Sequence, residues 1–287
     1  MSLSYIGNQC VIYGGLTCLI GGLLGNSLNV FIFSIEGNYR KSPCTFYFMA
    51  ASIANIIYMS VNFTARIAGV IMGIDFTTTS VGWCKMRQYL IVALSLTTLT
   101  CSCLAAIDQF FITSRNVSLR RLSKIESAHR IVVVVVIVWF LHAIPSPIFY
   151  NISPTTKKCV TTNDGFAVYN RVYLLGLLCI FPITVTSLFG YLTYRNIRQT
   201  RALAEQNANR QLTRMTLFQV VFIIICLIPY SINSTYGFIT ESYVKSASRL
   251  AIENFVTTIA ILVTYLYYSV CLFCFSCRIL QNFELSF

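Results

Sequence analysis

Seven long apolar segments, separated by short polar stretches, constrain this chain more than any other feature of its sequence. The segments cover about residues 10–35, 43–72, 84–112, 128–150, 171–194, 215–237 and 250–273. A helix needs about 20 apolar residues to cross the hydrocarbon core of a bilayer, and each segment is long enough. Because unpaired backbone groups are costly in lipid, each segment is expected to be helical. The sequence therefore predicts an all-α membrane protein, a bundle of seven transmembrane helices.

The composition supports this prediction. Hydrophobic residues make up 56% of the chain and charged residues only 10%, whereas a soluble domain has roughly 25% charged residues. Little of the chain lies outside the segments, so we expect residues 1–287 to form a single membrane domain. Apolar residues at helical spacing over 274–283 predict a short amphipathic helix on the membrane surface after the last segment.

Lys and Arg are distributed unequally over the polar stretches. The stretches after the first, third and fifth segments, together with the C-terminal tail, hold more of them than the N-terminus and the other loops. Cytoplasmic loops carry such an excess in membrane proteins. We therefore expect a multi-pass protein of the plasma membrane with its N-terminus outside the cell and its C-terminus in the cytoplasm. The net charge of +12 is explained by this topology, and no nucleic-acid partner is expected.

Enzyme and metal chemistry find no support in the sequence. The chain has two histidines and 12 cysteines, and the cysteines show no zinc-binding spacing. Most of them lie inside apolar segments, where they serve as small packing residues. We expect no enzyme activity, no metal and no cofactor. A transporter or channel remains an alternative, although the related halves that many transporters have are not evident.

Short motifs occur in a fixed order along the segments. They are Gly25-Asn26 in the first, Cys84 and Asp108 in the third, Trp139 in the fourth, Phe181-Pro182 in the fifth, Cys226-Leu227-Ile228-Pro229 in the sixth and Thr264-Tyr265-Leu266-Tyr267-Tyr268 in the seventh. Each motif is weak alone, but their order and spacing resemble the rhodopsin-like (class A) G-protein-coupled receptors over nearly the whole chain.

The chain also departs from this family at the positions of its activation switch. Gln109 replaces the arginine that follows the acidic residue, Asn55 the aspartate of the second segment, Leu227 the tryptophan of the sixth, and Thr264-Tyr265 the Asn-Pro pair of the seventh. The resemblance therefore implies a divergent member, either similar to peptide receptors or of unassigned ligand. It leaves open a decoy receptor with impaired signalling.

The resemblance implies roles for particular residues. Cys84 and Cys159 are expected to form a disulfide that holds the second outer loop over the helix bundle. Switch or structural roles are expected for Asn26, Asn55, Asp108, Gln109, Trp139, Pro182, Pro229 and Tyr268. A ligand cavity is expected to contain Arg66, Arg87, Gln88, Ile91, Glu253 and Asn254.

Two of these expectations also have a physical basis in the residues themselves. Asn26 and Asn55 are amides within apolar segments, so they need internal partners, and we expect them to link segments one, two and seven. Asp108 is an acid near the hydrocarbon edge, where acids are costly and tend to be functional. Its counter-charge is open, with Arg115 as a candidate.

The expected ligand follows from the outer basic residues. Arg66 and Arg87 suit an anionic group such as a peptide C-terminal carboxylate, although they can also extend to the lipid head groups. Ile91 stands where amine receptors carry an aspartate, which disfavours an amine. The predicted function is a receptor for an extracellular ligand, a small peptide, that signals to a heterotrimeric G protein. Pro182 and Pro229 are expected to kink spans five and six and so allow their movement.

Overall fold

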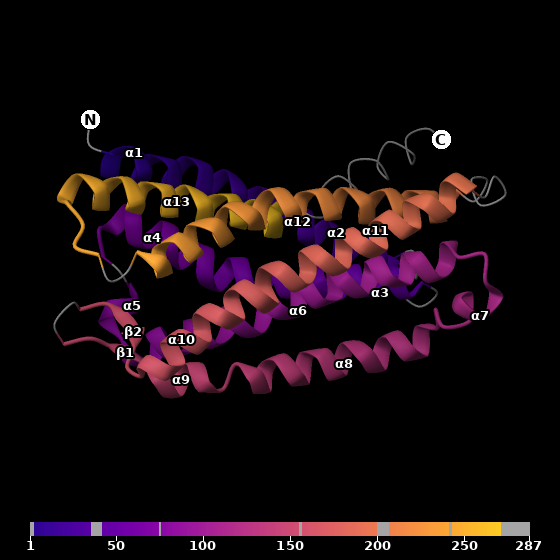
Figure 1. Ribbon diagram of the computed structural model, residues 1–287, viewed down its shortest axis with the longest axis horizontal. Coiled ribbons are helices and arrows are strands. Elements are labelled where there is room, and N and C mark those ends of the chain that lie inside the picture. The colour runs from indigo at the N-terminus through magenta and orange to yellow at the C-terminus, as the bar shows by residue number, and fades with distance from the viewer. Residues whose placement is uncertain are drawn as a thin grey trace.

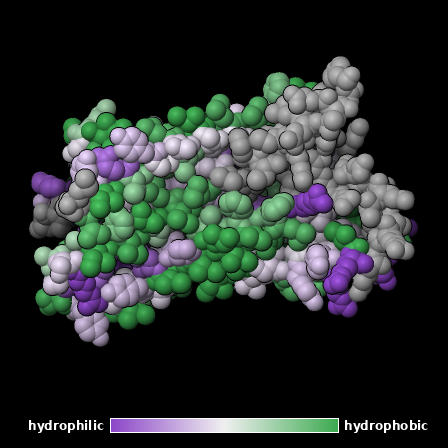
Figure 2. All heavy atoms as spheres, turned by 90° about the horizontal axis from the view of Figure 1, so that it is seen from above, coloured by the Kyte–Doolittle hydropathy of each residue, from purple (hydrophilic) through white to green (hydrophobic). Residues whose placement is uncertain are grey.

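The computed structural model describes residues 3–35, 42–74, 76–154, 157–199, 207–240 and 243–270, so the predicted surface helix at 274–283 lies outside the described residues. Within these ranges, seven helical stretches are long and apolar enough to cross a membrane, which confirms the predicted helical class. The stretches run along the long axis of the molecule (Figure 1). Figure 2 shows apolar side chains over the middle of one face and hydrophilic side chains toward its two ends, as a bilayer requires.

The elements follow a simple order along the chain. They are α1 (Leu3–Gln9), a π-helical segment (Cys10–Gly14), α2 (Gly15–Ile35), α3 (Pro43–Tyr58), a π-helical segment (Met59–Phe63), α4 (Thr64–Met72), α5 (Phe76–Thr79), α6 (Val81–Thr113), α7 (Val117–Arg120), α8 (Ile125–His142), α9 (Pro145–Phe149), β1 (Tyr150–Ile152), β2 (Cys159–Thr161), α10 (Asp164–Tyr173), a π-helical segment (Leu174–Ile180), α11 (Phe181–Gln199), α12 (Asn207–Ile239) and α13 (Ala247–Val270). Span one comprises α1 and α2, span two α3 and α4, span three α6, span four α8 and α9, span five α10 and α11, span six α12, and span seven α13.

Helix α6 forms the centre of the bundle. It runs through the middle of the view in Figure 1, with α8 on one side and α13 on the other. Small residues along it, including Ala93, Cys101 and Ala105, are completely buried. Small side chains let neighbouring helices approach closely, which is a main source of packing energy in lipid. The third span is therefore in a position to contact most of the others.

Spans one and two also approach each other closely. A Cβ built on Gly22 in α2 would lie only 2.7 Å from the sulfur of Met59, at the π-helical segment of span two. Only glycine fits at this contact without a shift of its neighbour. The glycine-rich sequence of the first span thus supports helix packing.

The polar stretch between spans four and five contains a short β-hairpin. Strands β1 and β2 pair antiparallel, with Asn151 opposite Val160. Each strand has only three residues, too few for a periodic pattern to be recognised in the sequence. The end of the bundle that carries β1 and β2 is called the hairpin end, and the opposite end, which carries Arg115, Arg120 and Arg121, is called the arginine-rich end.

Span five begins earlier than the predicted Arg171. Helix α10 starts at Asp164, and the side chain of Asn163 accepts a hydrogen bond from the Phe166 N–H over 2.9 Å. Asparagine at this position satisfies a backbone donor that has no partner within the helix. The extra turns therefore continue span five beyond its apolar segment at the hairpin end.

The two predicted kink prolines lie in different helical contexts. Pro229 lies inside α12, whereas Pro182 lies at the start of α11, directly after the π-helical segment Leu174–Ile180. Proline has no N–H, so it removes one backbone hydrogen bond from its helix. Near each proline a hydroxyl bonds to a backbone carbonyl: Thr186 donates to Pro182 over 2.6 Å and Ser231 donates to Leu227 over 2.8 Å.

Candidate functional site

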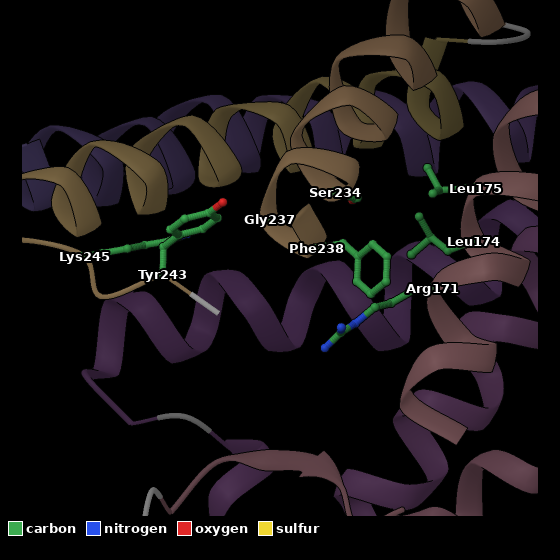
Figure 3. Close-up of a pocket in the computed structure, with 8 residues that line it drawn as sticks. All are labelled: Arg171, Leu174, Leu175, Ser234, Gly237, Phe238, Tyr243 and Lys245. Carbon is green, nitrogen blue, oxygen red and sulfur yellow. The ribbon is translucent and has the colours of Figure 1, made fainter. Parts of the chain in front are cut away.

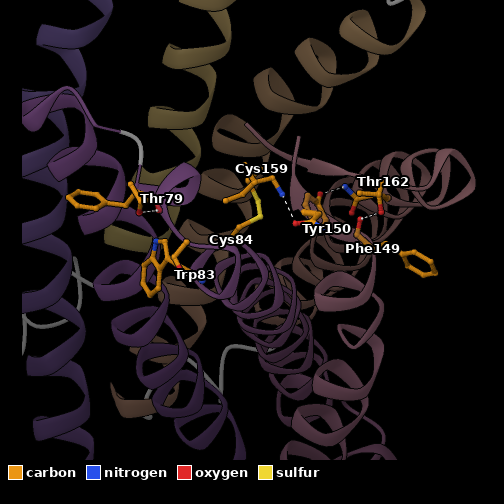
Figure 4. Close-up of a disulfide and its surroundings, with 12 residues drawn as sticks. Thr79, Trp83, Cys84, Phe149, Tyr150, Cys159 and Thr162 are labelled. Atoms are coloured by element: carbon orange, nitrogen blue, oxygen red, sulfur yellow. Dashed lines mark hydrogen bonds between the residues drawn. A yellow bond between two sulfur atoms is a disulfide. The ribbon is translucent and has the colours of Figure 1, made fainter. Parts of the chain in front are cut away.

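A disulfide fastens the β-hairpin to the central helix. It joins Cys84, in the first turn of α6, to Cys159, at the start of β2, with Cα atoms 5.8 Å apart (Figure 4). The predicted disulfide is therefore confirmed. It links residues separated by 75 positions, and a disulfide typically stabilises a fold by about 2–4 kcal/mol. Within the hairpin, the Thr162 hydroxyl after β2 donates to the Phe149 carbonyl before β1 over 2.9 Å, which joins the two ends of the hairpin.

A cavity of about 310 Å³ lies among spans two, three, five, six and seven, next to the hairpin, whose Tyr150 lines it. The polar residues on its wall include Asn62, Arg66, Arg87, Gln88, Ser95, Asn170, Tyr230 and Tyr265. Among the described residues that line it there are two arginines and no Asp or Glu. The cavity is therefore positively charged.

Four of the six residues expected to contact a ligand line this cavity, namely Arg66, Arg87, Gln88 and Ile91. Glu253 and Asn254 lie on α13 outside its wall. Asn254 is exposed, and Glu253 accepts a hydrogen bond from the Tyr236 hydroxyl over 2.9 Å. Position in the sequence indicates the depth of a residue in the bundle, but not the direction in which its side chain points.

The two cavity arginines differ in how they are held. Arg87 donates from Nε to the side-chain oxygen of Asn62 over 3.0 Å, and the Asn62 amide donates to the Tyr265 hydroxyl over 2.8 Å. The Nε atom of Arg66 is buried and has no hydrogen-bond partner in the described part of the chain. Burying such a donor without an acceptor is costly. The site is therefore suited to a ligand that supplies an acceptor.

Tyr150 brings a further hydrogen-bonding group from the hairpin. The side chain of Asn170 donates to its hydroxyl over 3.1 Å. Burial raises the pKa of the Tyr150 phenol above its usual value, while the bond from Asn170 opposes this effect. The phenol is thus protonated at neutral pH, and its proton is available to an acceptor in the cavity.

A buried chain of hydrogen bonds connects four spans further along the bundle. Asn26 donates to the Tyr268 carbonyl over 3.1 Å, and Asn55 donates to the Asn26 side-chain oxygen over 3.2 Å. Thr98 then donates to the side-chain oxygen of Asn55 over 2.8 Å. The two amides thus link spans one, two and seven. Thr98 adds span three, which the sequence did not indicate.

A second buried group joins spans three, six and seven. The hydroxyl oxygens of Ser102 and Tyr267 lie 2.9 Å apart, and the amide of Gln219 donates to Ser102. The family resemblance points to Tyr268, but it is Tyr267, with 0% exposure, that lies in this group. The side chain of Tyr268 lines the cavity instead. The sequence shows which polar residues lie within the apolar segments. It does not show which of them form hydrogen bonds with one another.

Asp108 and Gln109 are both buried near the arginine-rich end of α6. The Ser123 hydroxyl donates to one carboxylate oxygen of Asp108 over 2.6 Å. The Thr213 hydroxyl of α12 donates to the side-chain oxygen of Gln109 over 2.9 Å. Gln109 therefore links spans three and six through a neutral hydrogen bond, at the position where related receptors carry arginine.

Trp139 attaches span four to span three. Its indole N–H donates to the Thr100 hydroxyl over 2.9 Å, and its ring meets His142 edge-on with centroids 5.5 Å apart. Tryptophan provides both apolar contact area and one directional donor. This residue thus holds a span that faces lipid over much of its length.

The buried chain of hydrogen bonds through Asn26, Asn55 and Thr98 is called the polar core. Together with the described spans and the cavity beside the hairpin, it defines a helical membrane receptor. The model of the seven-transmembrane receptors of the rhodopsin family matches residues 25–277. The chain therefore belongs to this family, and it is a class A G-protein-coupled receptor, a multi-pass membrane protein that signals rather than an enzyme. The transporter or channel alternative is set aside by this membership. No match was found among curated proteins.

Proposed function

We propose that this receptor recognises an anionic extracellular ligand, and that a small peptide with a free C-terminal carboxylate is the favoured class. The observation that carries the proposal is the pair Arg66 and Arg87 on a cavity wall without a described carboxylate. A guanidinium binds a carboxylate through charge-assisted and often bidentate hydrogen bonds. Ile91 on the same wall offers no counter-charge to an amine.

The proposed orientation places the hairpin end outside the cell and the arginine-rich end in the cytoplasm. The excess of basic residues in the loops at the arginine-rich end supports it. The Cys84–Cys159 bond agrees, because disulfides persist on the extracellular side of a membrane. The N-terminus is then extracellular and the C-terminus cytoplasmic, in the plasma membrane.

Signalling is proposed to proceed by a population shift between two arrangements of the helices. A ligand in the cavity contacts Leu227 and Tyr230, which flank Pro229 in span six. Movement of span six at this proline, together with span five, separates the inner ends of spans three and six. The Thr213–Gln109 hydrogen bond then breaks and opens a cleft for a heterotrimeric G protein.

The test uses cells that express the receptor with G-protein biosensors and a library of short peptides. Each peptide is supplied as the free acid and as the C-terminal amide. Active free acids are expected to be about tenfold more potent than their amides, because the charge-assisted bond is worth roughly 1.5 kcal/mol more than a neutral one. Arg87→Gln is expected to remove this preference.

Lys158→Gln provides the control, since Lys158 is an exposed cation at the hairpin end outside the cavity. For this variant, the ratio between the potencies of free acids and amides is expected to match that of the unmodified receptor. Equal potency of acids and amides would refute the carboxylate site. Binding of free acids without any G-protein response would instead identify a decoy receptor and refute the signalling step.

A further inference from the structure

A second cavity of about 540 Å³ opens at the hairpin end, between span five, the end of α12 and the loop that precedes α13 (Figure 3). Arg171 and Phe238 lie together on one side of it, and Tyr243 and Lys245 lie on the other. Leu174 lines both this cavity and the ligand cavity. The two cavities therefore lie next to each other, on either side of this leucine.

This second cavity also has a positive lining. Arg171 and Lys245 line it, and its described wall contains no Asp or Glu. The guanidinium carbon of Arg171 lies 5.1 Å from the centre of the Phe238 ring. A cation–π contact of this kind positions the guanidinium at the cavity wall. An acidic group that enters here competes with the groups that already contact Arg171 and Lys245.

Lys245 is held by a carboxylate from outside the cavity. Its ammonium nitrogen lies 2.5 Å from one oxygen of Glu253, and the other oxygen of Glu253 accepts from Arg249 over 3.0 Å. The Tyr236 hydroxyl donates to that second oxygen as well, over 2.9 Å. A single carboxylate thus serves two cations. If Lys245 turns to another anion, Glu253 keeps Arg249 and Tyr236, so no charge is left without a partner.

We propose that the second cavity is a subsite for a second acidic group of the ligand, and that this group exchanges with Glu253 for Lys245. The inference rests on the proposed function, in which the first acidic group binds at Arg66 and Arg87. It narrows the ligand class to short peptides with an acidic side chain and a free C-terminal carboxylate. Glu253, which lies outside both cavities, acts as the resident competitor for Lys245.

The test uses the full-length receptor in lipid nanodiscs and synthetic peptides as probes. The two-acid probes have an N-terminal glutamate joined to a C-terminal phenylalanine by one to three glycines, with a free carboxylate. The one-acid probes have glutamine in place of the glutamate. The best two-acid probe is expected to bind about tenfold more tightly than its one-acid counterpart, since it gains a charge-assisted contact. Calorimetric titration measures both affinities.

Lys245→Gln is expected to abolish this tenfold advantage while the one-acid probe binds as before, which also shows that the variant is folded. Glu253→Gln is expected to increase the affinity for the two-acid probe about threefold, because the resident competitor is lost. A purely structural role of Glu253 predicts unchanged or weaker binding instead. Glu126→Gln, at an exposed acid of the arginine-rich end, serves as the matched control and should change neither affinity.

The outcomes separate this inference from the proposed function. Arg87→Gln is expected to weaken every probe by about tenfold. If it does so while Lys245→Gln and Glu253→Gln leave the two-acid advantage intact, the second subsite is refuted and the first stands. If Arg87→Gln changes no affinity, or no probe binds, the carboxylate site itself is refuted and the second subsite with it.

Discussion

The Thr213 hydroxyl of α12 donates a hydrogen bond over 2.9 Å to the side-chain oxygen of Gln109 in α6. This contact joins spans three and six near the arginine-rich end, and neither partner is charged. A neutral hydrogen bond contributes about 0.5–1.5 kcal/mol, whereas charge-assisted bonds are roughly twice as strong. The hydrogen bond between spans three and six is therefore a weak one, at the position where the family has an arginine.

Thr213→Val is expected to increase ligand-independent G-protein activation about threefold to fivefold. Valine keeps the shape of threonine but loses the hydroxyl, and a loss of about 1 kcal/mol shifts a two-state equilibrium by that factor. Biosensor output at matched surface expression measures the effect. Thr235→Val is the control, because the Thr235 hydroxyl bonds within α12 to the Ser231 carbonyl. An unchanged basal signal for Thr213→Val would argue against the proposed contact as a restraint.

The neighbouring tyrosines of span seven are expected to respond differently to the same substitution. Tyr267→Phe removes the hydroxyl that lies 2.9 Å from Ser102, and should lower the stability of the receptor by about 1 kcal/mol. Tyr268→Phe leaves this group intact and should alter ligand potency, because its side chain lines the cavity. Thermal unfolding in nanodiscs and dose–response curves measure the two effects. A loss of stability in Tyr268→Phe together with a change of ligand potency in Tyr267→Phe would contradict the structure.

Asn55→Ala is expected to destabilise the receptor by about 1–2 kcal/mol. It leaves the Thr98 hydroxyl and the side-chain oxygen of Asn26 without the partners that they have in the polar core. Thermal unfolding measures the loss. Ser34→Ala is the comparison, since the Ser34 side chain is exposed and its hydroxyl donates within its own helix to the Val30 carbonyl. If the two changes lowered stability equally, the polar core would not be a source of stability.

Cys84→Ser is expected to lower stability by about 2–4 kcal/mol and to abolish the response to ligand. The disulfide restrains the hairpin that brings Tyr150 to the cavity wall. Surface expression, thermal unfolding and biosensor output together measure the loss, and Cys159→Ser should reproduce it. Cys10→Ser replaces a free cysteine near the same end of the bundle and should have little effect. A full ligand response from Cys84→Ser would show that the hairpin does not shape the site.

Two parts of the site could be predicted because the residues that form them stand out in the sequence. The Cys84–Cys159 bond was implied by the resemblance to the receptor family, and the link between Asn26 and Asn55 followed from the need of buried amides for partners in lipid. The exchange partner Lys245 and the restraint Thr213 could not be predicted in the same way. Both lie in or next to polar loops, where lysine and threonine have many solvent-exposed alternatives.

The sequence by itself determined that the chain crosses the membrane and where it does so. Lipid offers no hydrogen bonds, so each apolar stretch must form a helix whatever the rest of the molecule does. The tertiary structure alone decided which side of each helix meets the cavity, and hence that Arg66 and Arg87 line it while Glu253 does not. Consecutive helical residues point about 100° apart, and lipid is as apolar as the side chains that it contacts. The rotation of each helix is therefore set by its packing against the others.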